Sequence, residues 1–375
     1  MKKFSSAKFL LLIILVFTAG SVKSQITTTT RFKLNGKHVF ERKDVKSWTV
    51  SQELIDEKTG ETITKENLIT EKGEKVKFDL PKIKGKETIY HIVGEGENFT
   101  QKYTVRVFEP DKISSFLYKS EGNPAVRTYV FVPKSLSAET RILLVMHGLS
   151  RNADDYIASW ETWAAKKDYI VIAPNFDEEN WKGSAMYNLG NILTEKDSME
   201  NRSKWSFQVV EDIHISAKDG FDLKKNYFDM FGHSAGGQFV HRFALFMPES
   251  NLRLAIAANS GWYTVPDLEQ KFPYGLKHAR FSFTQADLMR WSKRYVYILR
   301  GVDDTERSDN LRQNAETDAQ GQNRFERAGF MFDKIKSVNA ETNWRLIDVP
   351  KVAHDQKKMA VAAQYVLDLI NSQNK

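Results

Sequence analysis

The sequence contains no cysteine among its 375 residues. This absence excludes disulfide bonds, thiolate metal sites, a cysteine nucleophile and the acylated cysteine of a bacterial lipoprotein. Stability must therefore come from the hydrophobic core, and a chain of this length can bury a large one. Because 375 residues exceed what one core usually serves, we expect one large domain and one smaller domain.

Long hydrophobic runs are also scarce, with one exception near the N-terminus. Three lysines precede an apolar run over residues 9–17, and small and polar residues follow as far as Ser24. This order is typical of a cleaved export signal, and the run is too short to span a bilayer comfortably as a membrane anchor. We therefore predict a signal peptide at residues 1–24, export to the periplasm or out of the cell, and no integral membrane segment in the mature chain.

Positive charge is in excess but is not concentrated. The net charge is +7, yet lysines alternate with acidic residues, as in residues 71–75. A solvated surface of mixed sign accounts for this pattern, so we expect no nucleic-acid partner. With 41% apolar and 27% charged residues, the composition is that of an ordinary globular protein.

Residues 25–110 show a β pattern. Apolar and polar residues alternate over residues 75–80 and 103–108, turn residues stand at 59–60 and 72–73, and no useful helical period is present. Short strands separated by turns predict a small all-β, sandwich-like module. Such a module could tether the chain to a polymer, a cell wall or a partner protein.

The pattern changes near residue 111, and from there to residue 375 strands alternate with helices. Apolar, strand-like runs occur at residues 128–132, 142–146, 169–173, 227–231, 254–258, 295–299 and 344–349. Helical patterns lie between them at residues 153–166, 207–217, 237–246, 325–338 and 356–370. Most of the strand-like runs are continuously apolar, as in strands that helices cover on both faces. The second domain is therefore predicted to be α/β, with a mostly parallel sheet between two layers of helices.

The sequence Gly-His-Ser-Ala-Gly at residues 232–236 stands between an apolar strand and a helical pattern. A serine nucleophile is exposed when it lies on a tight, strained turn between a strand and a helix, and glycines leave room for that turn. The helix that follows also stabilises negative charge at its first turn. We predict that Ser234 is a nucleophile and that the backbone N–H of Ala235 helps to hold an oxyanion.

A second motif, His147-Gly148-Leu149, follows the apolar strand at residues 142–146. Acyl transfer builds an oxyanion, which two preorganised backbone N–H groups usually stabilise. We assign the second of these donors to Leu149. His147 is a candidate substrate contact, although it could simply end the strand.

A serine nucleophile needs a base within hydrogen-bond reach. Among the eight histidines, His354 is the best candidate because it lies in a loop between the last strand and the last helix. The acid that orients the base is expected after the strand at residues 295–299, where Asp303 and Asp304 are both candidates that spacing does not separate. The resulting chain order of Ser, Asp and His is one that α/β enzymes use.

From about residue 115 to the C-terminus, these residues resemble the α/β-hydrolase superfamily, and in particular extracellular esterases of the poly(3-hydroxybutyrate) depolymerase and feruloyl esterase type. Residues 299–305 and 320–329 look like the segment around the family acid, and that match favours Asp304 over Asp303. The resemblance implies an α/β-hydrolase fold and ester hydrolysis that needs no metal and no organic cofactor. The chain lacks the disulfides that many of these esterases carry.

The expected activity is hydrolysis of carboxylic esters through an acyl-enzyme, on an extracellular polymer or a glycan-linked ester. Two inserts, residues 177–203 and 261–292, contain aromatic residues that could wall a substrate site, with Trp181, Trp262 and Tyr263 as the candidates. Local packing is the alternative role for each of them. A serine peptidase of the same fold and a binding or adhesion protein with an inactive hydrolase domain are the alternative functions.

Overall fold

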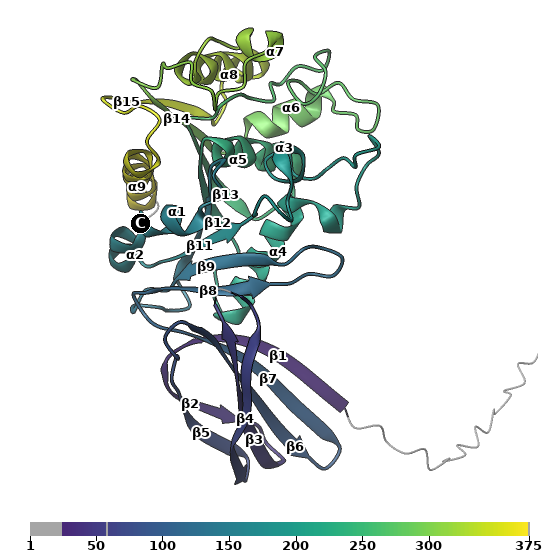
Figure 1. Ribbon diagram of the computed structural model, residues 1–375, viewed down its shortest axis with the longest axis vertical. Coiled ribbons are helices and arrows are strands. Elements are labelled where there is room, and N and C mark those ends of the chain that lie inside the picture. The colour runs from purple at the N-terminus through teal and green to yellow at the C-terminus, as the bar shows by residue number, and fades with distance from the viewer. Residues whose placement is uncertain (1–24, 58, 374–375) are drawn as a thin grey trace, which may run out of the picture.

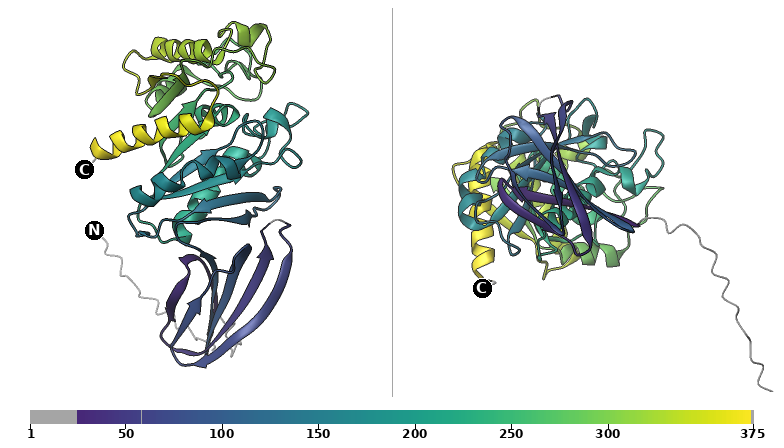
Figure 2. Two further views of the ribbon diagram at one scale, coloured as in Figure 1. Left: turned by 60° about the vertical axis from the view of Figure 1, so that its left-hand side comes forward. Right: turned by 90° about the horizontal axis from the view of Figure 1, so that it is seen from below.

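The computed structural model describes residues 25–57 and 59–373, so the predicted signal peptide lies outside the described residues. The chain forms two lobes stacked along the long axis, an N-terminal β lobe and a larger α/β lobe (Figure 1). A second direction of view places the β lobe at the same end of the molecule (Figure 2). Among the described residues, no helix is both long enough and apolar enough to cross a bilayer.

The N-terminal lobe contains two facing sheets. A five-stranded sheet has the order β1-β7-β6-β3-β4, and β2 pairs with β5. Trp48, Tyr90 and Val105 of the larger sheet share a core with Val76 and Leu80 of β5, which confirms the predicted sandwich-like module. The strands are β1 Gln25–Leu34, β2 Gly36–Glu41, β3 Val45–Asp56, β4 Thr62–Lys72, β5 Lys75–Leu80, β6 Lys86–Gly96 and β7 Phe99–Phe108.

The larger lobe is built on an eight-stranded sheet with the order β15-β14-β13-β12-β10-β11-β9-β8. Neighbouring strands are parallel from β15 to β11, whereas β9 and β8 are antiparallel additions at one edge. The predicted mostly parallel sheet is confirmed, but the edge strand β8 was not predicted. The strands are β8 Ile113–Tyr118, β9 Val126–Phe131, β10 Arg141–Met146, β11 Tyr169–Asn175, β12 Phe228–His233, β13 Leu252–Ala258, β14 Val296–Gly301 and β15 Arg345–Val349.

The predicted helices are present with one correction, and three further helices, at residues 183–186, 285–292 and 315–318, were not predicted. The single helix expected at residues 153–166 is two helices, α1 and α2. The helix is interrupted because Trp160 turns into the core, where its ring centroid lies 5.1 Å from that of Phe231. A 3₁₀ turn covers Arg202–Lys204. The α-helices are α1 Ala153–Ala158, α2 Glu161–Lys167, α3 Gly183–Met186, α4 Ser206–Gly220, α5 Ala235–Phe246, α6 Gln285–Ser292, α7 Ala315–Asp318, α8 Arg324–Val338 and α9 Gln356–Gln373.

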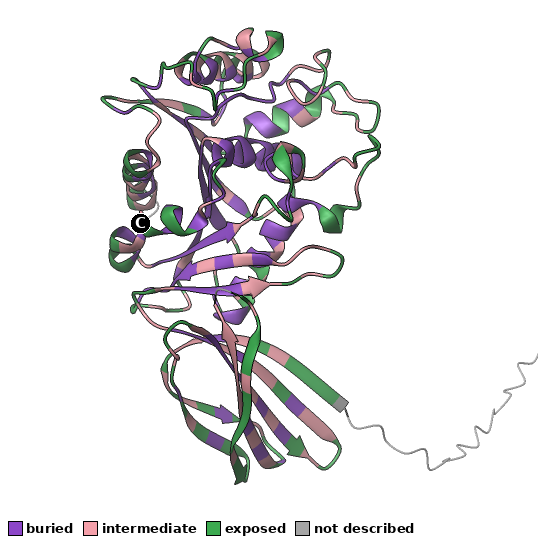
Figure 3. Ribbon diagram, viewed as in Figure 1, coloured by how far each residue is buried: buried purple, intermediate pink, exposed green. Residues whose placement is uncertain are grey.

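Each face of the large sheet carries its own hydrophobic core. Along β10, Leu144 and Met146 belong to one core, and Leu143 and Val145 belong to the other. Helices α4, α5 and α8 contribute to the first core, and α1, α2 and α9 contribute to the second. Buried residues accordingly concentrate in this sheet and in α5 (Figure 3). The sheet is thus held rigidly from both sides, which fixes the positions of the loops at its carboxyl edge.

An aromatic cluster joins the two lobes. The ring of Phe32 in β1 lies 5.5 Å from Phe108, 5.9 Å from Phe116 and 5.1 Å from Phe221. Phe32 and Phe108 belong to the N-terminal lobe, whereas Phe116 and Phe221 belong to the larger lobe. The cluster lies near the β8 edge of the large sheet, so the N-terminal lobe is far along the sheet from β15 (Figure 1).

Candidate active site

Ser234 lies on a sharp turn between β12 and α5. Its φ of 58° and ψ of −117° place a non-glycine residue in a strained backbone region. A Cβ added to Gly232 would lie 2.2 Å from the carbonyl oxygen of Gly236, and one added to Gly236 would lie 2.1 Å from that of Met146. Only glycine fits at both positions, and this is why the pentapeptide can form the turn.

Three loops at the carboxyl edge of the sheet bring Ser234, His354 and Asp304 together. Nε2 of His354 lies 3.0 Å from Oγ of Ser234, and Nδ1 lies 2.8 Å from Oδ2 of Asp304. The residues follow β12, β15 and β14, respectively. Asp304 is 2% exposed, whereas Asp303 is exposed, so it is Asp304 that contacts the histidine.

The hydrogen bonds of His354 define what this arrangement can do chemically. If Nδ1 carries the proton and donates it to Asp304, Nε2 is left to accept the hydroxyl proton of Ser234. A carboxylate that is nearly inaccessible to water also stabilises the imidazolium that forms when the proton arrives. This geometry would allow His354 to activate the hydroxyl of Ser234.

Asp304 has a second charged neighbour, Arg324, at the start of α8. Nη1 of Arg324 lies 3.5 Å from Oδ1 of Asp304, and Nη2 donates to Oδ1 of Asn310 at 2.6 Å. The side chains of Arg324 and Asp304 are each 2% exposed. Burial lowers the pKa of Arg324, and the charge of Asp304 opposes that effect. No reasoning from the sequence singled out this arginine, although it lies in the segment that resembles the family acid region.

The loop of His147, Gly148 and Leu149 is held by hydrogen bonds to its carbonyl groups. The carbonyl of Gly148 accepts from Nδ1 of His147 at 2.9 Å and from the backbone N–H of Arg151 at 3.3 Å. The hydroxyl of Tyr187 donates to the carbonyl of His147 at 2.8 Å. Because a trans peptide unit points its C=O and N–H in opposite directions, the Leu149 N–H faces away from these partners. Within the described chain, neither it nor the Ala235 N–H makes a recorded hydrogen bond.

The expectation that His147 contacts substrate is corrected by the structure. The residue is fully buried, and its Nε2 accepts the backbone N–H of Phe176 at 3.0 Å while Nδ1 faces Gly148. Both ring nitrogens are therefore used inside the protein. Burial lowers the pKa of His147 to about 3, so the ring is neutral and its tautomer is fixed by these two partners. His147 shapes the loop and does not face the solvent.

His233, next to Ser234, packs against the imidazole of His354 with 4.5 Å between ring centroids. Its Nδ1 lies 3.2 Å from the hydroxyl of Tyr156, which also occupies the space where a Cβ of Gly148 would be. Burial is the main cause that lowers the pKa of His233 well below its usual range. The charge on His354 is a second, smaller cause and acts in the same direction. A neutral His233 thus fixes one face of His354 and is not a competing base.

The predicted aromatic wall is also corrected. Trp181, Trp262 and Tyr263 are at most 2% exposed. The ring of Trp262 lies between two guanidinium groups. Its centroid is 4.1 Å from the guanidinium carbon of Arg242 and 4.9 Å from that of Arg312. Trp181 and Tyr263 each pack against another ring of the protein. Because protein groups already cover them, Trp262 and Tyr263 do not present an open surface to a ligand, whereas Trp181 also borders a hollow among the inserts.

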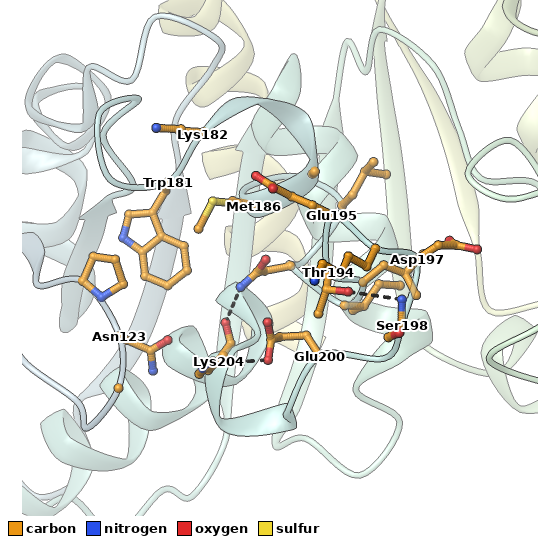
Figure 4. Close-up of a pocket in the computed structure, with 18 of the residues that line it drawn as sticks. Asn123, Trp181, Lys182, Met186, Thr194, Glu195, Asp197, Ser198, Glu200 and Lys204 are labelled. Carbon is orange, nitrogen blue, oxygen red and sulfur yellow. Dashed lines mark hydrogen bonds and ion pairs between the residues drawn. The ribbon is translucent and has the colours of Figure 1, made fainter.

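One hollow is formed mainly by the inserts and is not lined by Ser234. It has a volume of about 890 Å³, and its lining includes Trp181, Met186, Thr194 and Phe272 but none of the residues that bond to His354 (Figure 4). Lys182 and Glu195 also line it (Figure 4). Over residues 25–57 and 59–373, no group of three or more His, Cys, Asp or Glu side chains is arranged to hold a metal ion.

Solved structures share this fold and part of the sequence. Poly(aspartic acid) hydrolase-1 from Sphingomonas sp. KT-1 is 34% identical with a TM-score of 0.66, over 69% of this chain and 98% of that one. The chain belongs to the α/β-hydrolase superfamily. A second similar structure is LpqC, a poly(3-hydroxybutyrate) depolymerase from Bordetella parapertussis, at 27% identity and TM-score 0.65, over 68% of this chain and 90% of that one. No protein-family model matches the chain, and no curated protein matches it.

These similarities confirm the resemblance to α/β-hydrolases of the depolymerase type that the sequence indicated. They also identify this α/β-hydrolase as a hydrolytic enzyme by its relatives.

Proposed function

We propose that this α/β-hydrolase cleaves carboxylic esters by acyl transfer to Ser234. The observation that carries the proposal is the continuous line of hydrogen bonds from Ser234 through His354 to Asp304, at 3.0 and 2.8 Å, behind a strained turn. A serine hydroxyl is a weak nucleophile until an adjacent base accepts its proton. In this line, His354 is the base and Asp304 orients it.

In the first half of the proposed reaction, Ser234 Oγ attacks the ester carbonyl as its proton passes to Nε2 of His354. The oxyanion is held by the N–H groups of Leu149 and Ala235, and the imidazolium is stabilised by Asp304. His354 then returns the proton to the departing alcohol. In the second half, water attacks the acyl-enzyme with His354 again as base, which releases the acid and restores Ser234.

The proposed substrate is an extracellular ester in a polymer or linked to a glycan. Two observations support this class: the export signal predicted at residues 1–24, and the similarity to a poly(3-hydroxybutyrate) depolymerase. A polymer cannot enter a cell, so an enzyme that cleaves one works outside. The N-terminal lobe would then tether the enzyme to its substrate or to the cell wall.

Amide hydrolysis is the second candidate function. The structural relative with 34% identity is named a poly(aspartic acid) hydrolase, and poly(aspartic acid) is a polyamide. The same serine, base and oxyanion donors serve ester and amide cleavage, because both proceed through a tetrahedral intermediate. A binding protein with an inactive hydrolase domain is disfavoured, since the hydrogen bonds of His354 are intact.

Hydrolysis of p-nitrophenyl acetate and butyrate by the mature chain from Gln25 tests the proposal. We expect turnover in the parent and labelling by a fluorophosphonate probe, both lost in Ser234→Ala and retained in Ser337→Ala, which changes an exposed serine on α8. Release of aspartyl fragments from poly(aspartic acid) without turnover of either ester would favour the amide function. Equal rates in parent and Ser234→Ala would overturn the assignment of Ser234.

A further inference from the structure

Gln238 lies one helical turn after Ser234, on α5. Its backbone N–H donates to the carbonyl of Ser234 at 3.1 Å, and the residue is 7% exposed. The turn that presents Ser234 therefore also fixes the point from which this side chain starts. The reaction proposed above gives the side chain no task.

Two donors set the orientation of the Gln238 amide. Nδ2 of Asn188 donates to Oε1 at 2.9 Å, and Nη1 of Arg242 lies 3.4 Å from the same oxygen. A guanidinium can only donate hydrogen bonds, so the oxygen of the amide, and not its nitrogen, must face Arg242. The Nε2 group is therefore turned away from Arg242.

Arg242, which holds this amide, is itself fixed in place. It is fully buried, its Nε donates to Oγ1 of Thr264 at 2.8 Å, and its Nη1 donates to the carbonyl of Asn188 at 3.1 Å. Its guanidinium carbon also lies 4.1 Å from the ring centroid of Trp262. A donor that is held by such rigid neighbours loses little conformational entropy when a ligand binds to it.

The Nε2 group of Gln238 has no hydrogen-bond partner among the described residues. Unlike Nη2 of Arg242, which also lacks a partner but is buried, Nε2 is accessible to solvent. A Cβ added to Gly261, in the loop after β13, would lie 2.9 Å from Nε2. Apart from atoms of its chain neighbours, no other atom of the described residues lies within 4 Å of that Cβ. The two N–H groups of Nε2 thus border an open space beside this loop.

We propose that Nε2 of Gln238 binds the substrate by donating a hydrogen bond to a carbonyl or ether oxygen near the scissile bond. An amide nitrogen only donates, so this group recognises an acceptor and gains nothing from an alkyl group of the same shape. An oligomeric ester supplies such an oxygen in its next unit, whereas a simple alkyl ester does not. The inference rests on the proposed function of Ser234, because it concerns the substrate of the same site.

Two pairs of esters that match in shape test this inference. The p-nitrophenyl esters of 4-oxopentanoate and 4-methylpentanoate differ by an oxygen on the acyl side, and 2-methoxyethyl butyrate and butyl butyrate differ by one on the alcohol side. In the parent we expect kcat/KM to be about 5- to 10-fold higher for the oxygen-bearing ester of at least one pair, mostly through a lower KM, since the bond is made to a group that does not react. Equal values of kcat/KM within both pairs overturn the inference.

Gln238→Glu removes the donor but keeps an oxygen for Asn188 and Arg242. A carboxylate beside a guanidinium stays ionised and only accepts hydrogen bonds, so we expect the preference for the oxygen-bearing ester to disappear. The alkyl ester of the pair should be affected much less. A purely structural role of Gln238 would change both esters equally and leave their ratio at the parent's value.

Gly261→Ala tests the same donor without changing Gln238, because the new methyl group would lie against Nε2. It is expected to reduce the preference, whereas Gln373→Glu, which changes an exposed glutamine at the end of α9, should retain the parent's ratio. A preference that persists in Gln238→Glu overturns the inference, and if that variant does not fold, the ratio in Gly261→Ala decides in the same way. Absence of turnover and of fluorophosphonate labelling in the parent would instead overturn the proposed function, so the two failures are distinguishable.

Discussion

At the scale of single residues, the buried side chain of His147 orients a peptide unit of the candidate active site without contacting the substrate. Its Nδ1 holds the carbonyl of Gly148, and that carbonyl belongs to the same peptide unit as the N–H of Leu149. Rotation of this peptide unit would remove the proposed oxyanion donor. The histidine is therefore expected to affect the chemical step more than substrate binding.

Replacing His147 with Leu removes the donor to the Gly148 carbonyl. We expect kcat for p-nitrophenyl butyrate to fall by about 10²-fold, the effect of losing one oxyanion donor, with KM nearly unchanged. Steady-state kinetics measure both values. His38→Gln, a change in the N-terminal lobe, is the control, and a rise in KM at constant kcat in His147→Leu would argue that His147 binds substrate instead.

His214 on α4 makes folding stability depend on pH. Burial lowers its pKa to about 4 from the ordinary 6.5, and the ring packs against Phe228 with 4.5 Å between centroids. In the window between these two values the unfolded chain binds the proton and the folded protein does not. The stability that His214 contributes is therefore complete above about pH 6.5 and is lost as the pH falls toward 4.

Replacing His214 with Phe should remove this dependence, since neither ring nitrogen has a hydrogen-bond partner among the described residues. We expect the free energy of unfolding to fall less between pH 7 and pH 5 in the variant, by about 2 kcal/mol. Urea denaturation at the two pH values measures the difference. An identical fall in parent and variant would contradict the assigned cause.

At the scale of elements, the turn between β12 and α5 depends on two glycines that leave no space for a side chain. Gly236→Ala would bring a methyl group to within 2.1 Å of the Met146 carbonyl in β10. We expect a loss of about 1–3 kcal/mol in the free energy of unfolding and loss of most fluorophosphonate labelling. Gly85→Asn, at an open turn position with φ of 71°, should change neither by much.

Most elements of the larger lobe were predictable because their apolar runs are long and bounded by turns. Strand β12 was expected at residues 227–231 and is Phe228–His233, and α8 was expected at 325–338 and is Arg324–Val338. Strand β8 was missed because an edge strand needs no continuous apolar run. The break before α2 was missed because a buried Trp160 fits a helical period as well as it fits a turn.

The site was only partly predictable from sequence. The chain order and the turn residues predicted Ser234, Asp304 and His354 as site residues. In the structure, His354 contacts both Ser234 and Asp304. Arg324 was not found because nothing local to α8 indicates that its guanidinium reaches the loop after β14. The roles of His147 and Trp262 were misjudged because burial depends on partners that are distant in sequence, such as Phe176 and Arg242.

At the scale of the whole molecule, the two lobes are joined through the rings around Phe32. Phe32→Ala would leave a void between β1, β8 and the end of α4. We expect a loss of about 3–5 kcal/mol in the free energy of unfolding, the usual result of deleting a buried phenylalanine. Differential scanning calorimetry measures it, and Phe99→Ala, at the far end of β7 from Phe108, is expected to cost less because Phe99 is only partly buried.

The same arrangement separates the N-terminal lobe from the residues that carry the proposed chemistry. The lobe lies beside the β8 edge of the sheet, whereas His354 follows β15 at the opposite edge (Figure 1). Mutations in the exposed strand β4 should therefore leave the turnover of small esters unchanged. If the lobe tethers the enzyme, only the hydrolysis of a polymer will respond to them.

The parallel pairing of β1 with β7 has a consequence for biogenesis. Gln25, the first described residue after the predicted signal, pairs with Phe99, and Leu34 pairs with Phe108. A chain that crosses a membrane from its N-terminus would deliver β1 first, but that strand has no partner until all the hairpins between it and β7 have followed. Closure over so many residues is slow compared with local hairpin formation. The first lobe would thus stay unfinished, and exposed to chaperones and proteases, until its last strand has been translocated.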